Sequence, residues 1–368
     1  MHVRYSYLPQ QFSEIDDLLD RIRSLAQQGD FTLGAELARF EARFAELIGS
    51  RHALGVGSGT DALKLSLKAL GVGFGDEVIT AANSFVATAG AIAELGARPV
   101  FVDCDDSFCM NVDQVEDVIS DKTRAIVPVH YTGAMTDMRK LMPVATKNRL
   151  PVVEDACQAI LGELDQRRAG TWGTAGAFSL HPLKNLNVWG DGGVIVTGDD
   201  ELANTLGLLR NHGMTSRDEI ALLGCNSRLD TLQALVGNWL IGQAENITSQ
   251  RIDNARYYDE QLGQLPEISL PARPARMRCV FHLYVVFAQN RDELYRYCRD
   301  KGIECKIHYP VPLYRQKGLA FLGYRAGAFP VADRHAASMI TFPCDQHLTR
   351  RQQDYVVKTV KEFYAGSS

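Results

Sequence analysis

The chain has 368 residues, of which 46% are hydrophobic and 23% charged, and its 39 Lys and Arg against 44 Asp and Glu give a net charge of −5. This is the composition of an ordinary globular protein, and the length favours two domains. The charge balance excludes the basic excess that nucleic-acid binding needs. No run approaches the roughly 20 apolar residues that span a bilayer, and residues 1–10 lack a signal-peptide pattern, so we expect a cytoplasmic protein without membrane association.

Helical and β-type patterns alternate from residue 36 onwards. Helices are expected at 36–48, 61–70, 85–95, 112–119, 138–148, 247–261, 292–301 and 350–363. Strands are expected at 77–80, 99–103, 124–130, 151–155, 176–180, 193–197, 281–287 and 304–308. The short connection between 176–180 and 193–197 predicts that these two strands are antiparallel neighbours.

This order predicts an α/β protein with two parts. Residues 1–248 are expected to form a large domain around a doubly wound mixed sheet, and residues 249–368 a smaller C-terminal α+β domain. The eight cysteines show no C-x-x-C spacing, which favours buried reduced thiols and no metal site.

Lys184 and Asp155 carry the chemical signal. Asp155 ends an apolar strand pattern, and Lys184 follows it by 29 positions (184 − 155) in an otherwise apolar segment. A lysine that loses water has a lowered pKa and can form a Schiff base with the aldehyde of pyridoxal 5′-phosphate (PLP), while a carboxylate can keep the cofactor's ring nitrogen protonated. Taken singly, a surface lysine and a helix-capping aspartate are the ordinary alternatives.

Other residues fit the same cofactor. The turn at Ser58-Gly59-Thr60 leads from a strand pattern into a helix, where free N–H groups favour a phosphate, although a simple helix N-cap is the alternative. Ser179 offers a hydroxyl for the phosphate, Gln158 an amide for the ring oxygen, and Phe85 a ring to stack on the pyridine. Asn226 offers an amide for an anion, and His181 is a histidine near the lysine.

With these motifs in order, the chain resembles the DegT-type PLP-dependent sugar aminotransferases, of fold type I in the aspartate aminotransferase superfamily. The stretches that carry the resemblance are Ser58–Leu63, Gly75–Ile79, Glu154–Ala159, Pro182–Leu186, Gly190–Gly193, Asn226–Asp230 and His308–Pro310. The resemblance implies a homodimer whose subunits share the active site, with Asn226 reaching the phosphate from the partner subunit. It also implies that His308 and Tyr309 face the sugar.

The resemblance implies an amino transfer from an amino acid, expected to be L-glutamate, to a nucleotide-linked keto sugar, with pyridoxamine 5′-phosphate as the intermediate cofactor form. The segment Gly190-Asp191-Gly192-Gly193 resembles that of relatives that act at sugar carbon 3, so the resemblance also implies amination there. His181 and Trp189 depart from the usual residues near the sugar site, so they are candidate substrate contacts. Amination of a cyclitol, a dehydration and a non-catalytic regulator remain alternatives, although Lys184 argues against the dehydratases.

Overall fold

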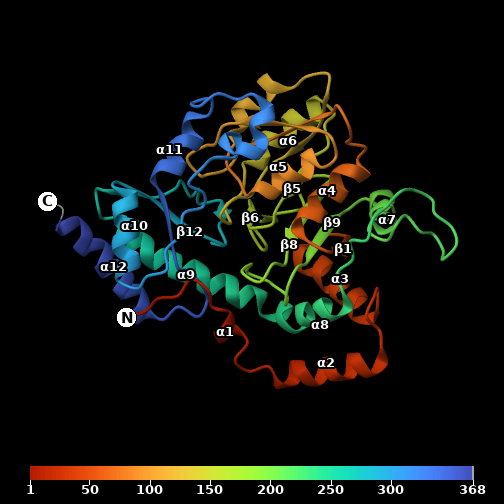
Figure 1. Ribbon diagram of the computed structural model, residues 1–368, viewed down its shortest axis with the longest axis horizontal. Coiled ribbons are helices and arrows are strands. Elements are labelled where there is room, and N and C mark those ends of the chain that lie inside the picture. The colour runs from red at the N-terminus through yellow and green to blue at the C-terminus, as the bar shows by residue number, and fades with distance from the viewer. Residues whose placement is uncertain (367–368) are drawn as a thin grey trace.

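The computed structural model describes residues 1–366, so residues 367–368 of the expected C-terminal domain lie outside the described part (Figure 1). A large mixed sheet forms the centre of the molecule. Four of its strands lie in the order β1 (His52–Val56), β9 (Gly193–Thr197), β8 (Ala175–Ser179) and β5 (Val153–Asp155). Three more lie in the order β4 (Thr123–Val127), β2 (Glu77–Ala81) and β3 (Arg98–Val102).

Isolated parallel bridges, Ile126–Val152 and Val129–Asp155, join the two groups into one seven-stranded surface. Within it β9 runs antiparallel to both β1 and β8, whereas β8 and β5 are parallel, as are β2 and its two neighbours. The predicted antiparallel pairing of the strands around Lys184 is therefore confirmed.

Helices cover both faces of this sheet, because alternate strand residues feed two separate cores. Val194 and Val196 of β9 pack with one set of helices, and Ile195 packs with the other. The first core includes residues of α2 (Asp16–Gln28), α3 (Ala35–Ile48), α6 (Met138–Lys147) and α8 (Thr231–Leu240). The second includes residues of α4 (Gly59–Ala69), α5 (Val86–Ala93) and α7 (Asp200–Leu209). The doubly wound arrangement is confirmed.

A smaller antiparallel sheet lies beyond α9 (Ala244–Leu262). Its strands are β10 (Ile268–Ser269), β12 (Tyr284–Ala288) and β13 (Met339–Phe342), and it packs with α10 (Arg291–Asp300) and α12 (Arg350–Ala365). Val3 is buried in this same core and bridges to Ile303, so the N-terminal segment lies beside α10 and α12 (Figure 1). The predicted domain boundary at 248/249 falls inside α9 and stays a prediction.

Two expected elements are wrong. Residues 112–119 form two short 3₁₀ turns, at Val112–Gln114 and Glu116–Val118, because apolar residues three apart suit the tighter helix. Residues 304–308 form no strand: Lys306 pairs with Thr341, but the Cys305 N–H bonds back to the Ile303 carbonyl and so leaves no continuous ladder. The remaining short elements are α1 (Leu8–Gln11), β6 (Glu163–Leu164), β7 (Arg167–Arg168), β11 (Met277–Arg278) and α11 (Pro330–Ser338).

Among residues 1–366, no helix combines the length and apolar character needed to cross a membrane. In that same part of the chain, no group of three or more His, Cys, Asp or Glu side chains is placed to hold a metal ion.

Phe44 offers a test of the packing under the sheet. Its ring is fully buried and meets Phe178 edge-on at 5.3 Å between centroids. We expect Phe44→Ala to lower the free energy of unfolding by about 3–5 kcal/mol, because it removes buried contacts and leaves a cavity. Phe74, which is 96% exposed, is the control, and Phe74→Ala should change stability by less than about 0.5 kcal/mol. Equal shifts of the urea midpoint in both variants would contradict this description of the core.

Candidate active site

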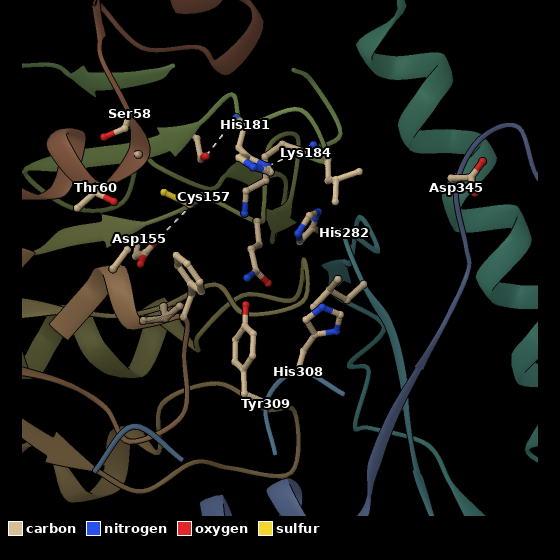
Figure 2. Close-up of a pocket in the computed structure, with 18 of the residues that line it drawn as sticks. Ser58, Thr60, Asp155, Cys157, His181, Lys184, His282, His308, Tyr309 and Asp345 are labelled. Atoms are coloured by element: carbon tan, nitrogen blue, oxygen red, sulfur yellow. Dashed lines mark hydrogen bonds between the residues drawn. The ribbon is translucent and has the colours of Figure 1, made fainter. Parts of the chain in front are cut away.

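One cavity of about 410 Å³ opens at the carboxyl ends of the parallel strands, where ligands of α/β sheets bind. Residues from the large sheet, the N-terminal segment and the smaller sheet line it together. Ten of the residues predicted from the sequence are among them: Gly59, Thr60, Phe85, Asp155, Gln158, Ser179, His181, Lys184, His308 and Tyr309. Figure 2 shows Lys184 near the middle, with Asp155, Thr60 and Cys157 on one side and His282 on the other.

Lys184 lies in the irregular connection between β8 and β9. Because β9 runs antiparallel to β8, this connection stays at the edge of the sheet where β5 ends with Asp155. Burial lowers the pKa of the Lys184 amine from its ordinary value, and the neighbouring Cys157 and Asp155 raise it by less. A lowered pKa favours the neutral amine, which is the nucleophilic form.

Asp155 ends β5 and is 6% exposed. Its Oδ2 accepts a hydrogen bond of 2.7 Å from the Thr88 hydroxyl, and its Oδ1 accepts one of 3.2 Å from the Cys157 N–H. No described residue forms a salt bridge with this carboxylate. A buried carboxylate with hydrogen bonds but no cation suits a positively charged ligand atom.

Glu154 points to the opposite face of β5 and is also fully buried. Its carboxylate accepts hydrogen bonds from the backbone N–H groups of Gly170, Trp172 and Gly173, at 2.9, 2.6 and 2.7 Å, and lies 2.8 Å from His130 Nε2. The Thr136 N–H donates to His130 Nδ1, so Nε2 carries the proton that is given to Glu154. The Glu154–His130 pair therefore holds β5 in place on the face opposite the cavity. The sequence reasoning missed this pair, although strand alternation places residues 154 and 155 on opposite faces.

The turn before α4 forms an anion cradle. Ser58 caps the helix, because its Oγ accepts the Asp61 N–H at 3.0 Å, so Thr60 is not the capping residue. A Cβ on Gly59 would lie 2.8 Å from Ser179 Cβ and 2.9 Å from Cys157 Sγ. The backbone here therefore approaches its neighbours as only glycine allows, and the helix N-terminus faces the cavity beside Ser179.

Gln158 and Phe85 border the cavity on the side of the large sheet. The Gln158 Oε1 accepts the Thr132 N–H at 2.8 Å, which leaves its amide N–H groups as donors for a ligand. Phe85 is 51% exposed, and its ring centroid lies 5.9 Å from that of Tyr309. An exposed ring beside a cavity is available for stacking.

The two cavity histidines predicted from the sequence favour their neutral forms. Burial lowers the pKa of His308 to about 4, and its Nδ1 lies 2.9 Å from the Thr341 hydroxyl. Burial and the nearby Lys184 lower the pKa of His181. Both rings can therefore exchange hydrogen bonds with a neutral, hydroxyl-rich ligand without carrying a charge.

Two predicted site residues lie outside this cavity. Trp189 packs edge-on against Phe12, with 5.6 Å between ring centroids, and its carbonyl accepts a hydrogen bond from Gln233. Its contact with the substrate stays a prediction. Asn226 is exposed and pairs through its backbone with Asn211.

The sequence reasoning missed several cavity residues, among them Tyr5, Tyr7, Arg251 and His282. Arg251 is 3% exposed, and within residues 1–366 its Nη2 has no hydrogen-bond partner. Its position on the buried face of α9, four residues after Ile247 and four before Ala255, was a usable signal, because a charged residue on such a face needs a special partner. Nothing in the pattern of residues 1–7 indicated that the N-terminal segment reaches the site.

The comparisons with known proteins agree with this geometry. A family model described as the DegT/DnrJ/EryC1/StrS aminotransferase family matches residues 13–361. A pleiotropic regulatory protein of Geobacillus stearothermophilus is 39% identical over 99% of both chains. The dTDP-3-amino-3,4,6-trideoxy-alpha-D-glucose transaminase of Micromonospora megalomicea subsp. nigra is 38% identical over 98% of both chains.

A solved structure extends the likeness to three dimensions. The crystal structure of S. venezuelae DesV in complex with a ketimine intermediate superposes with a TM-score of 0.96, at 37% sequence identity and over 98% of each chain. The family match covers nearly all of the chain, and the fold agrees throughout. The chain therefore belongs to the DegT/DnrJ/EryC1/StrS aminotransferase family, whose members are PLP-dependent enzymes.

Proposed function

We propose that this enzyme transfers an amino group from an amino acid, expected to be L-glutamate, to carbon 3 of a nucleotide-linked keto sugar. The observation that carries the proposal is the placement of Lys184, with its lowered pKa, in one cavity with the buried carboxylate of Asp155. The substrate class is supported by the M. megalomicea relative, which is named as a dTDP-3-amino sugar transaminase.

The residues present fit PLP. When bound, this cofactor supplies an aldehyde and an electron-accepting ring. The Asp155 carboxylate, which lacks a cationic partner, would hold the proton on the ring nitrogen. Gly59, Thr60 and Ser179 would hold the phosphate at the helix N-terminus, where a side chain on Gly59 would fill the space.

Lys184 would then move protons. As a neutral amine it would accept the proton from the donor's α-carbon as general base, and would then give it as general acid to the cofactor carbon that takes up the amino group. Gln158 would donate to the ring oxygen, and Phe85 would stack on the ring. His181, His308 and Tyr309 are the proposed contacts with the sugar, because they line the same cavity.

A second candidate function comes from the G. stearothermophilus relative, which is named a regulatory protein. A regulator that binds a sugar without turnover would not need a buried lysine with a lowered pKa beside a buried carboxylate. The two functions differ in one measurable respect, since only the transferase releases a 2-oxo acid from the amino donor.

We further propose a homodimer in which each active site is completed by the partner subunit. Asn226 is exposed and lies outside the cavity of its own chain, although the resemblance assigns it to the phosphate. It follows a loop after α7 that projects from the body of the molecule (Figure 1). Ile220 and Leu223 on this loop are 64% and 83% exposed, which suits a surface that is covered on association.

The lysine is the first test. We expect the wild-type enzyme to show ping-pong kinetics, with parallel double-reciprocal lines for L-glutamate and the keto sugar. Lys184→Ala should lower kcat by at least about 100-fold, because it removes the proton carrier. Lys140→Ala, which changes an exposed lysine paired with Asp113, should leave kcat unchanged. Intersecting double-reciprocal lines, or full activity of the Lys184→Ala variant, would contradict the proposed reaction.

The glycine cradle is the second test. We expect Gly59→Ala to weaken PLP binding by at least about tenfold, because the added Cβ displaces Ser179 and costs hydrogen bonds to the charged phosphate. Gly73→Ala is the matched control, since a Cβ there meets nothing within 4 Å. Binding is measured by titrating cofactor-free protein and following PLP absorbance. Equal affinities of the two variants would place the phosphate elsewhere.

The shared site is the third test. Lys184→Ala and Asn226→Ala subunits are each expected to be nearly inactive alone. After mixing and re-equilibration, about a quarter of the sites should combine an intact Lys184 with an intact Asn226 from the other subunit, so about a quarter of wild-type activity should return. A mixture that stays inactive, although mass analysis shows mixed dimers, would mean that Asn226 does not act across an interface.

A further inference from the structure

The backbone carbonyl of Lys184 is held by two side chains. The Tyr7 hydroxyl donates to it at 3.0 Å, and the Asn187 Nδ2 donates to it at 2.9 Å. The segment that carries the lysine contains no helix or strand, so its position depends on such tertiary bonds. Tyr7 comes from a part of the chain that the proposed reaction does not use.

The second of these side chains begins a chain of amide groups. Asn187 is fully buried, and its Oδ1 accepts from Gln11 Nε2 at 2.8 Å. The Gln11 Oε1 accepts from Gln346 Nε2 at 3.0 Å, and the Gln346 Oε1 accepts from Arg251 Nε at 3.2 Å. Each donor has one acceptor, so the direction of every bond in the chain is consistent.

The chain closes on Tyr7. The guanidinium of Arg251 lies over the Tyr7 ring, 5.1 Å from its centroid. Tyr7 is 4% exposed, and burial raises its pKa, so the hydroxyl keeps the proton that it donates to Lys184. The result is a closed ring of contacts that joins the N-terminal segment, α9 and residue 346 to the lysine.

We propose that Tyr7 is a positioning residue for Lys184, and that residues 5–11 act as a strap that sets the reach of the lysine amine into the cavity. The inference rests on the proposed role of Lys184 as the proton carrier. A displacement of about 1 Å at a reacting group can lower a rate by as much as about 100-fold, so a single hydrogen bond to this backbone has a kinetic effect. Arg251 and Gln11 act through Tyr7 and Asn187.

The decisive variant is Tyr7→Phe, which keeps the ring beneath Arg251 and removes only the hydroxyl. We expect kcat to fall about tenfold while KM for both substrates stays within about twofold, because the lysine is misplaced and the binding surfaces are kept. The absorbance of the resting holoenzyme, titrated against pH, should shift its apparent pKa by about half a unit or more. This second readout requires cofactor binding and no turnover.

Tyr355→Phe is the matched control. The Tyr355 hydroxyl also donates to the backbone carbonyl of a lysine, Lys301, at 2.9 Å, but on the exposed surface of α12. It should change neither kcat nor the absorbance titration. If Tyr7→Phe leaves both readouts at their wild-type values, or changes them no more than Tyr355→Phe, the strap is not a positioning device.

Gln11→Leu tests the strap independently, should Tyr7→Phe fail to fold. This change leaves Asn187 Oδ1 without the Gln11 donor. We therefore expect kcat and the apparent pKa of the absorbance titration to shift in the same direction as for Tyr7→Phe. Unchanged values of both would overturn the inference. A wild-type enzyme that transfers no amino group would contradict the proposed function instead. In that case the absorbance titration of the holoenzyme still decides whether the strap acts on Lys184.

Discussion

Two ionisable side chains, Lys184 and Asp155, lie in one cavity at the edge of the large sheet, and the rest of the site depends on them. Burial favours the neutral form of Lys184. The Asp155 side chain accepts hydrogen bonds from Thr88 and Cys157 and forms no salt bridge within residues 1–366. Neither arrangement is favourable by itself, because buried polar groups need partners. Both suit a ligand that presents an aldehyde and a cationic ring nitrogen, so the two side chains are electrostatically complementary to PLP.

Much of this could be predicted from the sequence, because the informative residues sit at points where periodic patterns end. Asp155 closes an apolar strand, Gly59 opens a helix, and Lys184 lies between two strands whose short connection predicts their antiparallel pairing. Local patterns failed where tertiary contacts decide the outcome. Residues 112–119 have apolar spacing that suits two kinds of helix. At 304–308, the bond from the Cys305 N–H to the Ile303 carbonyl interrupts the expected strand.

The contacts missed by sequence reasoning come from segments remote in sequence. Glu154 and His130 are 24 positions apart, and Tyr7 and Lys184 are 177 apart. No periodicity relates such residues, because their meeting depends on how strands and chain ends are arranged in space. The α9 helix shows the same dependence: its first turns pack in the core of the large sheet, its later turns in the core of the small one, and Arg251 lies between them.

The reversal of β9 has a consequence for engineering this enzyme. Because β9 is antiparallel to both neighbours, the segment from His181 to Gly192 leaves and re-enters the sheet at the same edge, and no crossover helix depends on it. Directed evolution can therefore vary its outward positions while the scaffold persists. Libraries would keep Asn185, which donates to the Val280 carbonyl, and Asn187. They would diversify His181, which lines the cavity, to alter the choice of acceptor.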